Sequence, residues 1–188
     1  MPVKYDAARA LKRMLDNEVA IQFIKPGLET IIKSYLSLMN EFDNEELVDA
    51  FESIMIIFSR DIKPYARDIC THLKDQYIRC MAQDNAKEDE ESVRAAVASL
   101  NSMRRILDVV KADLPLTHEI QAIMYPCLEH SLTRNGIESL EEGVDCITLI
   151  LYNAYKKQPI CKEMWMFYPQ LLYVVAGDDH DKDGGYGF

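Results

Sequence analysis

The chain has 188 residues, 48% of them hydrophobic, which is enough apolar material for one domain with a buried core. Its 31 acidic and 21 basic side chains give a formal net charge of −10, which disfavours nucleic acid and anionic membrane and favours basic partners. No run of about 18 apolar residues is present, and the first residues lack the hydrophobic segment of a signal peptide. We therefore expect a soluble intracellular protein with no membrane span.

The first forty residues predict two helices. Pro2 stands near the start of the first helix, whose expected apolar stripe is Val3, Ala7, Ala10 and Met14. The second covers residues 18–40 and is either kinked at Pro26 or restarted there. Because helical arrays normally end in a polar cap, a chain that opens on such a helix suggests a segment of a longer array.

Residues 45–81 predict two helices joined by a proline-marked corner. Pro64 lies in the first turn of the second helix, where its missing N–H costs nothing. The apolar stripes are Leu47, Phe51, Ile54 and Phe58 in the first helix and Ile69, Leu73, Tyr77 and Cys80 in the second. Such broad stripes require neighbouring helices on both sides.

An acidic insert, residues 84–91, interrupts the helical pattern. Its carboxylates surround the single Lys87 and are Asp84, Glu88, Asp89, Glu90 and Glu91. Like charge at this density opposes packing and predicts a mobile loop. The loop is equally consistent with a flexible anionic clamp for a basic partner and with a solubilising insertion.

Four further helices are expected after the insert. The first covers residues 92–113; the second starts at Pro115, has a kink at Pro126 and stops at Asn135-Gly136; the others cover 138–157 and 160–176. Their stripes are Val93, Val97, Leu100, Met103 and Leu107; Ile120, Ile123, Met124, Leu128 and Leu132; Leu140, Val144, Ile147 and Leu151; Met164, Phe167, Leu171 and Val174. The aromatic group Trp165, Phe167, Tyr168 and Tyr173 is expected to form core or the stacking face for a next repeat.

Two interleaved series of helices share one register. Matching apolar triplets recur 44 to 47 residues apart and are Val3, Ala7, Ala10; Leu47, Phe51, Ile54; Val93, Val97, Leu100; Leu140, Val144, Ile147. The alternate helices carry an apolar or lysine pair ahead of Pro26, Pro64, Pro126 and Pro169, and only the interval that holds the insert is out of step. This spacing is typical of HEAT or armadillo units. We predict an all-α solenoid of about eight helices over residues 1–176, followed by a flexible acidic, glycine-rich tail at 177–188.

Enzyme and metal signatures are weak or missing. No nucleotide-binding, zinc-protease or serine-hydrolase motif is present. Cys127 and His130 offer two ligands on one helix, too few for a zinc site. The tail residues Asp179, Asp181, Asp183 and Gly184 match the opening of a calcium loop whose twelfth position is missing, so an acidic linker is the simpler interpretation. The five cysteines lie singly in helical patterns and are expected to be buried free thiols, as in a reducing compartment.

A ladder of polar residues lies opposite the apolar stripes of the register-matched helices. Its members are Asp49 and Ser53, Asn101 and Arg105, and Glu142 and Asp145. On a concave solenoid surface, Asp49, Glu142 and Asp145 would face a basic ligand; an ordinary solvated face is the competing interpretation.

The amino-acid sequence itself, beyond its pattern of apolar residues, resembles that of a known family. The residues that carry the resemblance are PVKYDAARALKRMLDNEVAIQFIKPGLETIIKSYLSLMNE, the acidic insert after Gln83, SVRAAVASLNSMRRILDVV and MWMFYPQLLYVV. They are similar to the importin-beta superfamily of nuclear transport receptors, most of all to its importin seven and importin eight branch. The resemblance implies a non-catalytic segment of a longer receptor, found in cytoplasm and nucleus, that carries basic cargo such as ribosomal proteins or histones.

In the full-length receptor, the resemblance also implies release of cargo by the GTPase Ran and contact with nucleoporins at the pore. No cofactor or metal is expected because the ligand motifs are incomplete, and the negative net charge argues against a nucleic acid or membrane partner. The competing class is a HEAT-repeat scaffold or regulatory subunit of a constitutive complex, and a metal-dependent enzyme is a more remote third.

Overall fold

The computed structural model describes residues 2–42, 44–81, 90–155 and 160–176. Over these residues it is all-α, with nine α-helices, short 3-10 turns and no strand. The helices are α1 Pro2–Met14, α2 Glu18–Ile24, α3 Leu28–Glu41, α4 Glu45–Ile57, α5 Ala66–Met81, α6 Glu90–Val110, α7 Leu114–Ser131, α8 Leu140–Tyr155 and α9 Phe167–Ala176. The predicted fold class is confirmed, and counting the broken pair α2 and α3 as one gives the expected eight helices.

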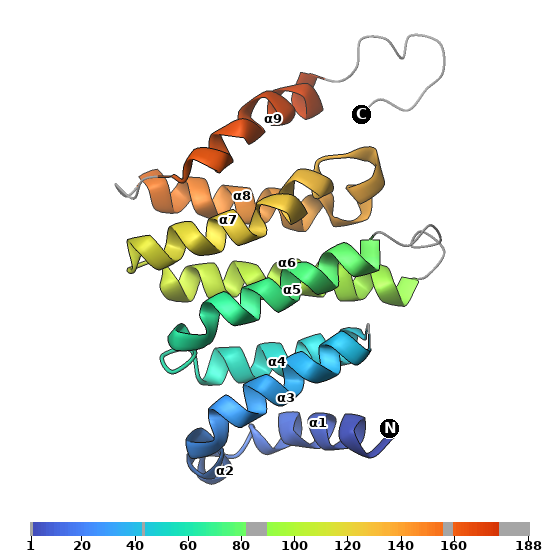
Figure 1. Cartoon of the computed structure of the whole chain (residues 1–188), viewed down its shortest axis with the longest axis vertical. Coiled ribbons are helices and arrows are strands. Elements are labelled where there is room, and N and C mark those ends of the chain that lie inside the picture. The colour runs from blue at the N-terminus through green and yellow to red at the C-terminus, as the bar shows by residue number, and fades with distance from the viewer. Residues whose placement is uncertain (1, 43, 82–89, 156–159, 177–188) are drawn as a thin grey trace.

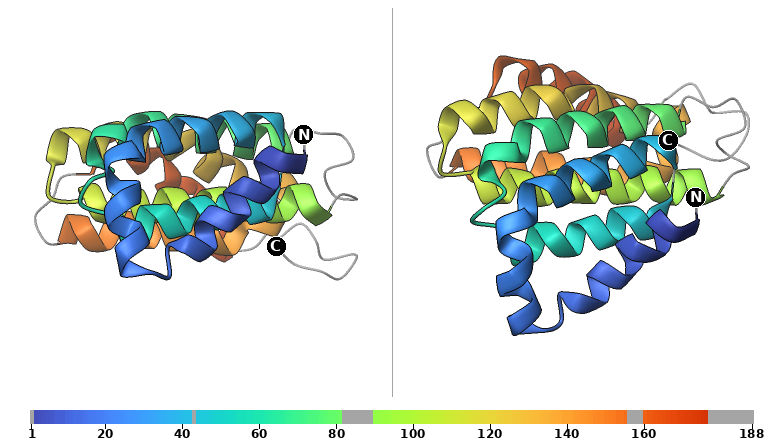
Figure 2. Two further views of the ribbon diagram at one scale, coloured as in Figure 1. Left: turned by 90° about the horizontal axis from the view of Figure 1, so that it is seen from below. Right: turned by 60° about the horizontal axis from the view of Figure 1, so that its bottom comes forward.

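The helices stack in two layers (Figures 1 and 2). In the first layer α1 packs on α4, α4 on α6 and α6 on α8; in the second, α3 packs on α5 and α5 on α7. The turn η4, Lys162–Met166, packs on α7 and leads into α9 at the end of the second layer. These layers are the two helical series that the register predicted, so the described residues form a helical-repeat solenoid.

All four helices of the first layer run in the same direction. Each begins at the edge that lies on the right in Figure 1, and the helices α3, α5 and α7 of the second layer end there. The connections at the opposite edge are the corners that precede α5 and α7 and the short helix α2. The stack therefore has one edge made of the N-termini of the first layer.

The second predicted helix is broken at Pro26. Helix α2 ends at Ile24, and the 3-10 turn η1, Lys25–Gly27, separates it from α3. Proline has no N–H to continue the helical ladder, so the chain turns at this point before the helix restarts.

The core confirms the predicted stripes of α4 and α5, but Val93 and Val97 of the α6 stripe are only partly buried and several stripe residues of α1 and α8 are exposed. All eight stripe residues of α4 and α5 are at most 2% exposed. In α1, Val3 is 78% and Met14 51% exposed; in α8, Val144 is 37% and Leu151 49% exposed. Helix α1 instead buries Ala8, and Leu15 directly after the helix is also buried, because α1 meets α4 with a different face from the one expected.

The proline series also needs a correction. Pro26 and Pro64 lie in 3-10 turns that lead into helices, and Pro169 is the third residue of α9. The matching proline of α7 is Pro115 in its first turn, whereas Pro126 lies inside the helix, which continues through it. Pro126 leaves the carbonyl of Ala122 without its helical donor, and the exposed position of Ala122 lets water replace that donor.

The corners are joined to one another by a repeated ion pair. Lys25 begins η1 and contacts Asp61 of the next corner, with Nζ–Oδ2 at 2.9 Å. Lys63 begins η2, Lys63–Tyr65, and contacts Asp113 of the following corner at 2.8 Å. The lysine that stands before proline in two of the sequence repeats therefore links each corner to its successor.

None of the helices in the described part of the chain is long and apolar enough to cross a membrane.

Candidate protein-binding edge

The acidic insert lies mostly outside the described residues. This applies to Asp84, Glu88 and Asp89, whereas Glu90 and Glu91 form the first turn of α6. The helix thus begins two residues earlier than expected. Carboxylates in a first turn are stabilised by the positive end of the helix dipole, which explains why these two residues continue the helix rather than the loop.

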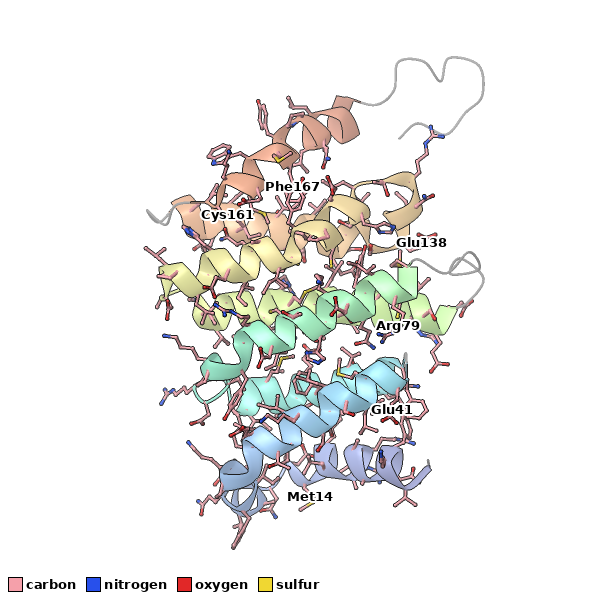
Figure 3. The ribbon with its side chains drawn as sticks, viewed as in Figure 1. Met14, Glu41, Arg79, Glu138, Cys161 and Phe167 are labelled. Carbon is pink, nitrogen blue, oxygen red and sulfur yellow. The ribbon has the colours of Figure 1, made fainter. Side chains whose placement is uncertain are left out.

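The same short motif, Glu-Glu-x-Val, opens three helices of the first layer. It occupies residues 45–48 in α4, 90–93 in α6 and 141–144 in α8. These helices start at one edge of the stack (Figure 1), so the motif brings Glu46, Glu90, Glu91, Glu141 and Glu142 to that edge. We define the acidic edge as Glu46, Glu90, Glu91, Glu138, Glu141 and Glu142; Glu138 is labelled there in Figure 3.

Hydrogen bonds tie the lower part of this edge together. Asn44 caps α4 by accepting from the backbone N–H of Leu47 at 3.3 Å, and its Nδ2 donates to the Glu91 carboxylate on α6. The Tyr5 hydroxyl of α1 donates to Glu46 Oε2 and lies 3.2 Å from Asn44 Oδ1. Burial, followed by the bond to Glu46 and its charge, raises the pKa of Tyr5. Three successive helices of the first layer are thereby fixed at their starting ends.

The upper part of the edge is positioned by the 3-10 turn η3, Arg134–Ser139. Ser139 is fully buried, and its Oγ lies 2.7 Å from the Tyr77 hydroxyl of α5. The same hydroxyl lies 3.1 Å from His130 Nδ1 of α7, and burial lowers the pKa of that imidazole. This network anchors the turn to the core, which leaves Glu138 and Glu141 exposed beside it.

The carboxylates exceed the positive charge available to them. A helix N-terminus carries about half an elementary charge, whereas α6 and α8 each place two carboxylates over one N-terminus. Arg9 contacts Glu46 at 3.2 Å and Arg94 contacts Glu90 at 3.6 Å. Among the described residues, Glu138, Glu141 and Glu142 form no ion pair, so the upper part of the edge keeps its negative charge.

The predicted helix-face carboxylates do not lie in one acidic strip. Asp49 lines a groove of about 430 Å³ between α1 and α4, together with Arg9, Lys12 and Arg13. Asp145 contacts Arg104 of α6 at 3.7 Å, and Arg105 of α6 pairs with Glu52 of α4. Glu142 belongs to the acidic edge.

Sequence reasoning missed Glu46, Glu138 and Glu141 as members of a common surface. For Glu46 and Glu141 the repeated Glu-Glu-x-Val motif was the available signal, since it marks the same turn of successive helices. Glu138 carried no such signal, because its place at the edge depends on η3 packing against α6 and α7 and on the contact of Ser139 with Tyr77 of α5.

The five cysteines are all buried, as expected. Burial raises the pKa of Cys127, and it raises that of Cys146 to about 12. His130 contacts Tyr77, and the part of the chain that the structure describes contains no group of three or more metal-ligating side chains. The calcium-like tail, with Asp179, Asp181 and Asp183, lies outside the described residues.

Comparison with known proteins places this stack in context. The chain is 28% identical over 178 residues to an importin beta-like SAD2 homolog of Arabidopsis thaliana, which covers 94% of the chain and 17% of that protein. It is 25% identical over 173 residues to a probable importin-7 homolog of Dictyostelium discoideum, and this match covers 92% of the chain and 16% of that protein. It is 26% identical over 182 residues to human importin-8, and this match covers 95% of the chain and 17% of that protein. The chain resembles importin-beta-like proteins.

This confirms the resemblance to the importin seven and importin eight branch on nearly the whole chain. The chain spans about one sixth of the length of these relatives. No protein-family model matches the chain, and no solved structure matches it significantly.

Proposed function

We propose that this chain is a non-enzymatic, protein-binding segment of a nuclear import receptor and that its acidic edge binds basic segments of protein cargo. The similarity to importin-beta-like proteins supports the receptor assignment, and the two-layer helical stack supplies an extended surface for a protein partner. The longer protein would move between cytoplasm and nucleus with such cargo.

The observation that carries the binding proposal is the alignment of three acidic helix starts on one edge. Lysine- or arginine-rich segments would meet successive carboxylates of α4, α6 and α8. The insert residues Asp84, Glu88 and Asp89 lie between α5 and α6 in the sequence and would add to the negative charge that such a segment meets. Asp49 and Asp145 would play a smaller part, because cations of this chain lie beside both. The contacts are exposed, so affinity should fall as salt shortens the screening length to about 10 Å at 0.1 M.

Charge reversal at the acidic edge tests this proposal. A fluorescent lysine-rich peptide is titrated with the wild-type chain and with the double variant Glu138→Lys/Glu141→Lys at low and physiological salt. Rim charges contribute about 0.2 to 1 kcal/mol each, so reversing two should weaken low-salt binding by about tenfold. A second variant reverses Glu88, Asp89, Glu90 and Glu91 and tests the insert.

The matched control is Glu18→Lys/Asp68→Lys, which changes the net charge equally at exposed carboxylates of α2 and α5, near the opposite edge. It should bind within about twofold of wild type if position matters more than net charge. Equal weakening in both double variants would leave only a non-specific charge effect, and unchanged binding in the edge variant would overturn the proposal.

Control by Ran is the part of the proposal that separates a transport receptor from a constitutive scaffold. Immobilised basic cargo is incubated with the full-length protein, and GTP-loaded or GDP-loaded Ran is then added. Release only by the GTP form would support a receptor, whereas a scaffold should keep its partner in both conditions.

A further inference from the structure

A groove of about 410 Å³ lies between the two inner helices of the first layer, α4 and α6. Helix α4 packs on α1 and α6, and α6 packs on α4 and α8, so both helices already have their neighbours along the stack (Figure 1). Because a repeat contacts mainly the next repeat, further repeats beyond either end would leave this groove open. It lies near the last turns of α4 and α6, at the edge opposite the acidic edge.

Most of the groove is apolar. Its apolar lining residues are Met55, Ile56, Ile62, Ile106, Val109 and Leu149. Ile56 is 53% exposed, although α4 lies between two other helices of its layer. The volume of the groove lies within the range of about 300 to 1,000 Å³ that is common for ligand sites. The groove can therefore accept apolar side chains of a ligand.

Arg104 lines this groove with hydrogen-bond donors that the chain leaves unsatisfied. Its Nε is buried and has no hydrogen-bond partner among the described residues. Its Nη1 lies 3.7 Å from Asp145 Oδ2, which is too far for a hydrogen bond. The Arg104 side chain is 37% exposed, so a ligand can reach the guanidinium. A buried donor without an acceptor is unfavourable, and a ligand acceptor at this guanidinium would therefore be stabilising.

The other charged residues that line the groove are paired within the chain. Arg105 pairs with Glu52, and Asp108 accepts from Lys111 at 2.9 Å. The unsatisfied donors therefore belong to Arg104, and a guanidinium matches a carboxylate through two parallel hydrogen bonds. A cationic ligand would instead meet two arginines, so the groove disfavours the basic segments that we propose for the acidic edge.

We propose that the groove between α4 and α6 binds a linear segment of a partner protein in which a carboxylate is flanked by apolar side chains. The carboxylate accepts from Arg104, and the flanking side chains cover Ile56 and Val109. This contact removes apolar surface from water and supplies the acceptor that Arg104 lacks. Because the groove and the acidic edge lie at opposite ends of the same helices, an acidic-apolar segment and a basic segment can bind together.

Fluorescence anisotropy with three short labelled peptides tests the chemistry of this site. The probe repeats the unit Leu-Glu-Glu-Ile, one control peptide has glutamine in place of each glutamate, and the other has serine in place of each apolar residue. The wild-type chain should bind the probe at least about tenfold more tightly than either control, because the proposed contact needs both the carboxylate and the apolar side chains. Equal binding of either control peptide would overturn the proposal.

Single substitutions test the location of the site. Arg104→Gln removes the guanidinium and Ile56→Ser removes the exposed apolar side chain, so each should weaken binding of the probe by about tenfold. The matched controls make the same changes at the exposed residues Arg134 of η3 and Ile78 of α5, and should bind within about twofold of wild type. Circular dichroism checks that all four variants are folded. Unchanged binding in the groove variants, or equal weakening in the controls, would contradict the proposal.

Sedimentation velocity without peptide tests whether a second copy of the chain fills the groove. Wild type and Ile56→Ser should have the same weight-average mass over about two decades of concentration. A mass that is lower only in the variant would assign the groove to self-association and rule out the proposed occupant. A wild-type chain that binds no probe, because a segment of its own chain fills the groove, would rule it out as well.

Discussion

Gly143 shows how a single residue sets the distance between two helices. It lies in the first turn of α8, where a Cβ atom would collide with the Oγ and Cβ of Ser131 at the end of α7. Ser131 is itself fully buried and donates to the carbonyl of Leu128 at 2.8 Å, so it has little room to move. The close approach of α7 and α8 therefore requires glycine at this position.

Gly143→Ala should destabilise the chain although alanine favours helix. The gain in helix propensity is about 1 kcal/mol, whereas overpacking in a rigid core costs about 1 to 3 kcal/mol. Urea denaturation should show a lower midpoint. In the Ser131→Gly background the same substitution should cost less, because the colliding atoms are gone; an equal cost in both backgrounds would refute this explanation.

At the residue scale, buried positions were easier to predict than polar ones. The periodicity of α4 and α5 identified all eight of their stripe residues, since apolar spacing alone determines which face of an inner helix packs. The contacts of Tyr77 with Ser139 and His130 span 62 and 53 residues and could not be predicted, because no local pattern brings such partners together.

At the scale of elements, the corners set the spacing of the repeats. Lys63 contacts Asp113, which also caps α7 by accepting from the backbone N–H of Leu116 at 3.3 Å. The bond from Lys63, followed by the backbone bond, lowers the pKa of Asp113. One carboxylate thus begins a helix and joins two corners.

Substitutions at this corner should separate the two roles. Lys63→Met removes only the ion pair, and Asp113→Ala removes the cap as well, so thermal melts should show a larger decrease in Tm for Asp113→Ala. The lowered pKa of Asp113 means that the ion pair stabilises the fold above the unfolded pKa of about 3.9 and ceases to do so as pH falls through the folded value. The difference in Tm between wild type and Lys63→Met should therefore become smaller in acid and at high salt. A difference that is constant across pH would contradict the ionic explanation.

Among the elements, helix starts were predicted best where proline or a capping side chain marks them. Pro26 and Pro64 both mark corners, and Asn44, a residue type common at helix N-caps, stands directly before α4 and accepts from the backbone N–H of Leu47. Pro126 was correctly expected inside its helix but wrongly matched to the corner prolines; the proline that marks the start of α7 is Pro115. The start of α6 was misplaced because acidic residues fit both a loop and a first turn.

At the scale of the whole molecule, the fold could be predicted because each helix contacts mainly its neighbours in the stack. A repeated register is then sufficient to give the order of the layers. The errors at α1 and α8 have the same origin, because the apolar register alone does not determine which face of a helix packs on its neighbours. The acidic edge was only partly predicted, because it depends on the common direction of the four first-layer helices.

The contact between α5 and α6 has a consequence for the evolution of this chain. Small residues of α6, among them Ala95, Ala96 and Ser99, are buried, and the two helices share the most extensive contact in the described chain. Because this interface holds the pair together, the connection from Met81 to Glu90 is not needed to align them, and loop-closure entropy rises only slowly with length. Insertions and deletions should accumulate at this connection, which can therefore acquire new sequence without disturbing the stack.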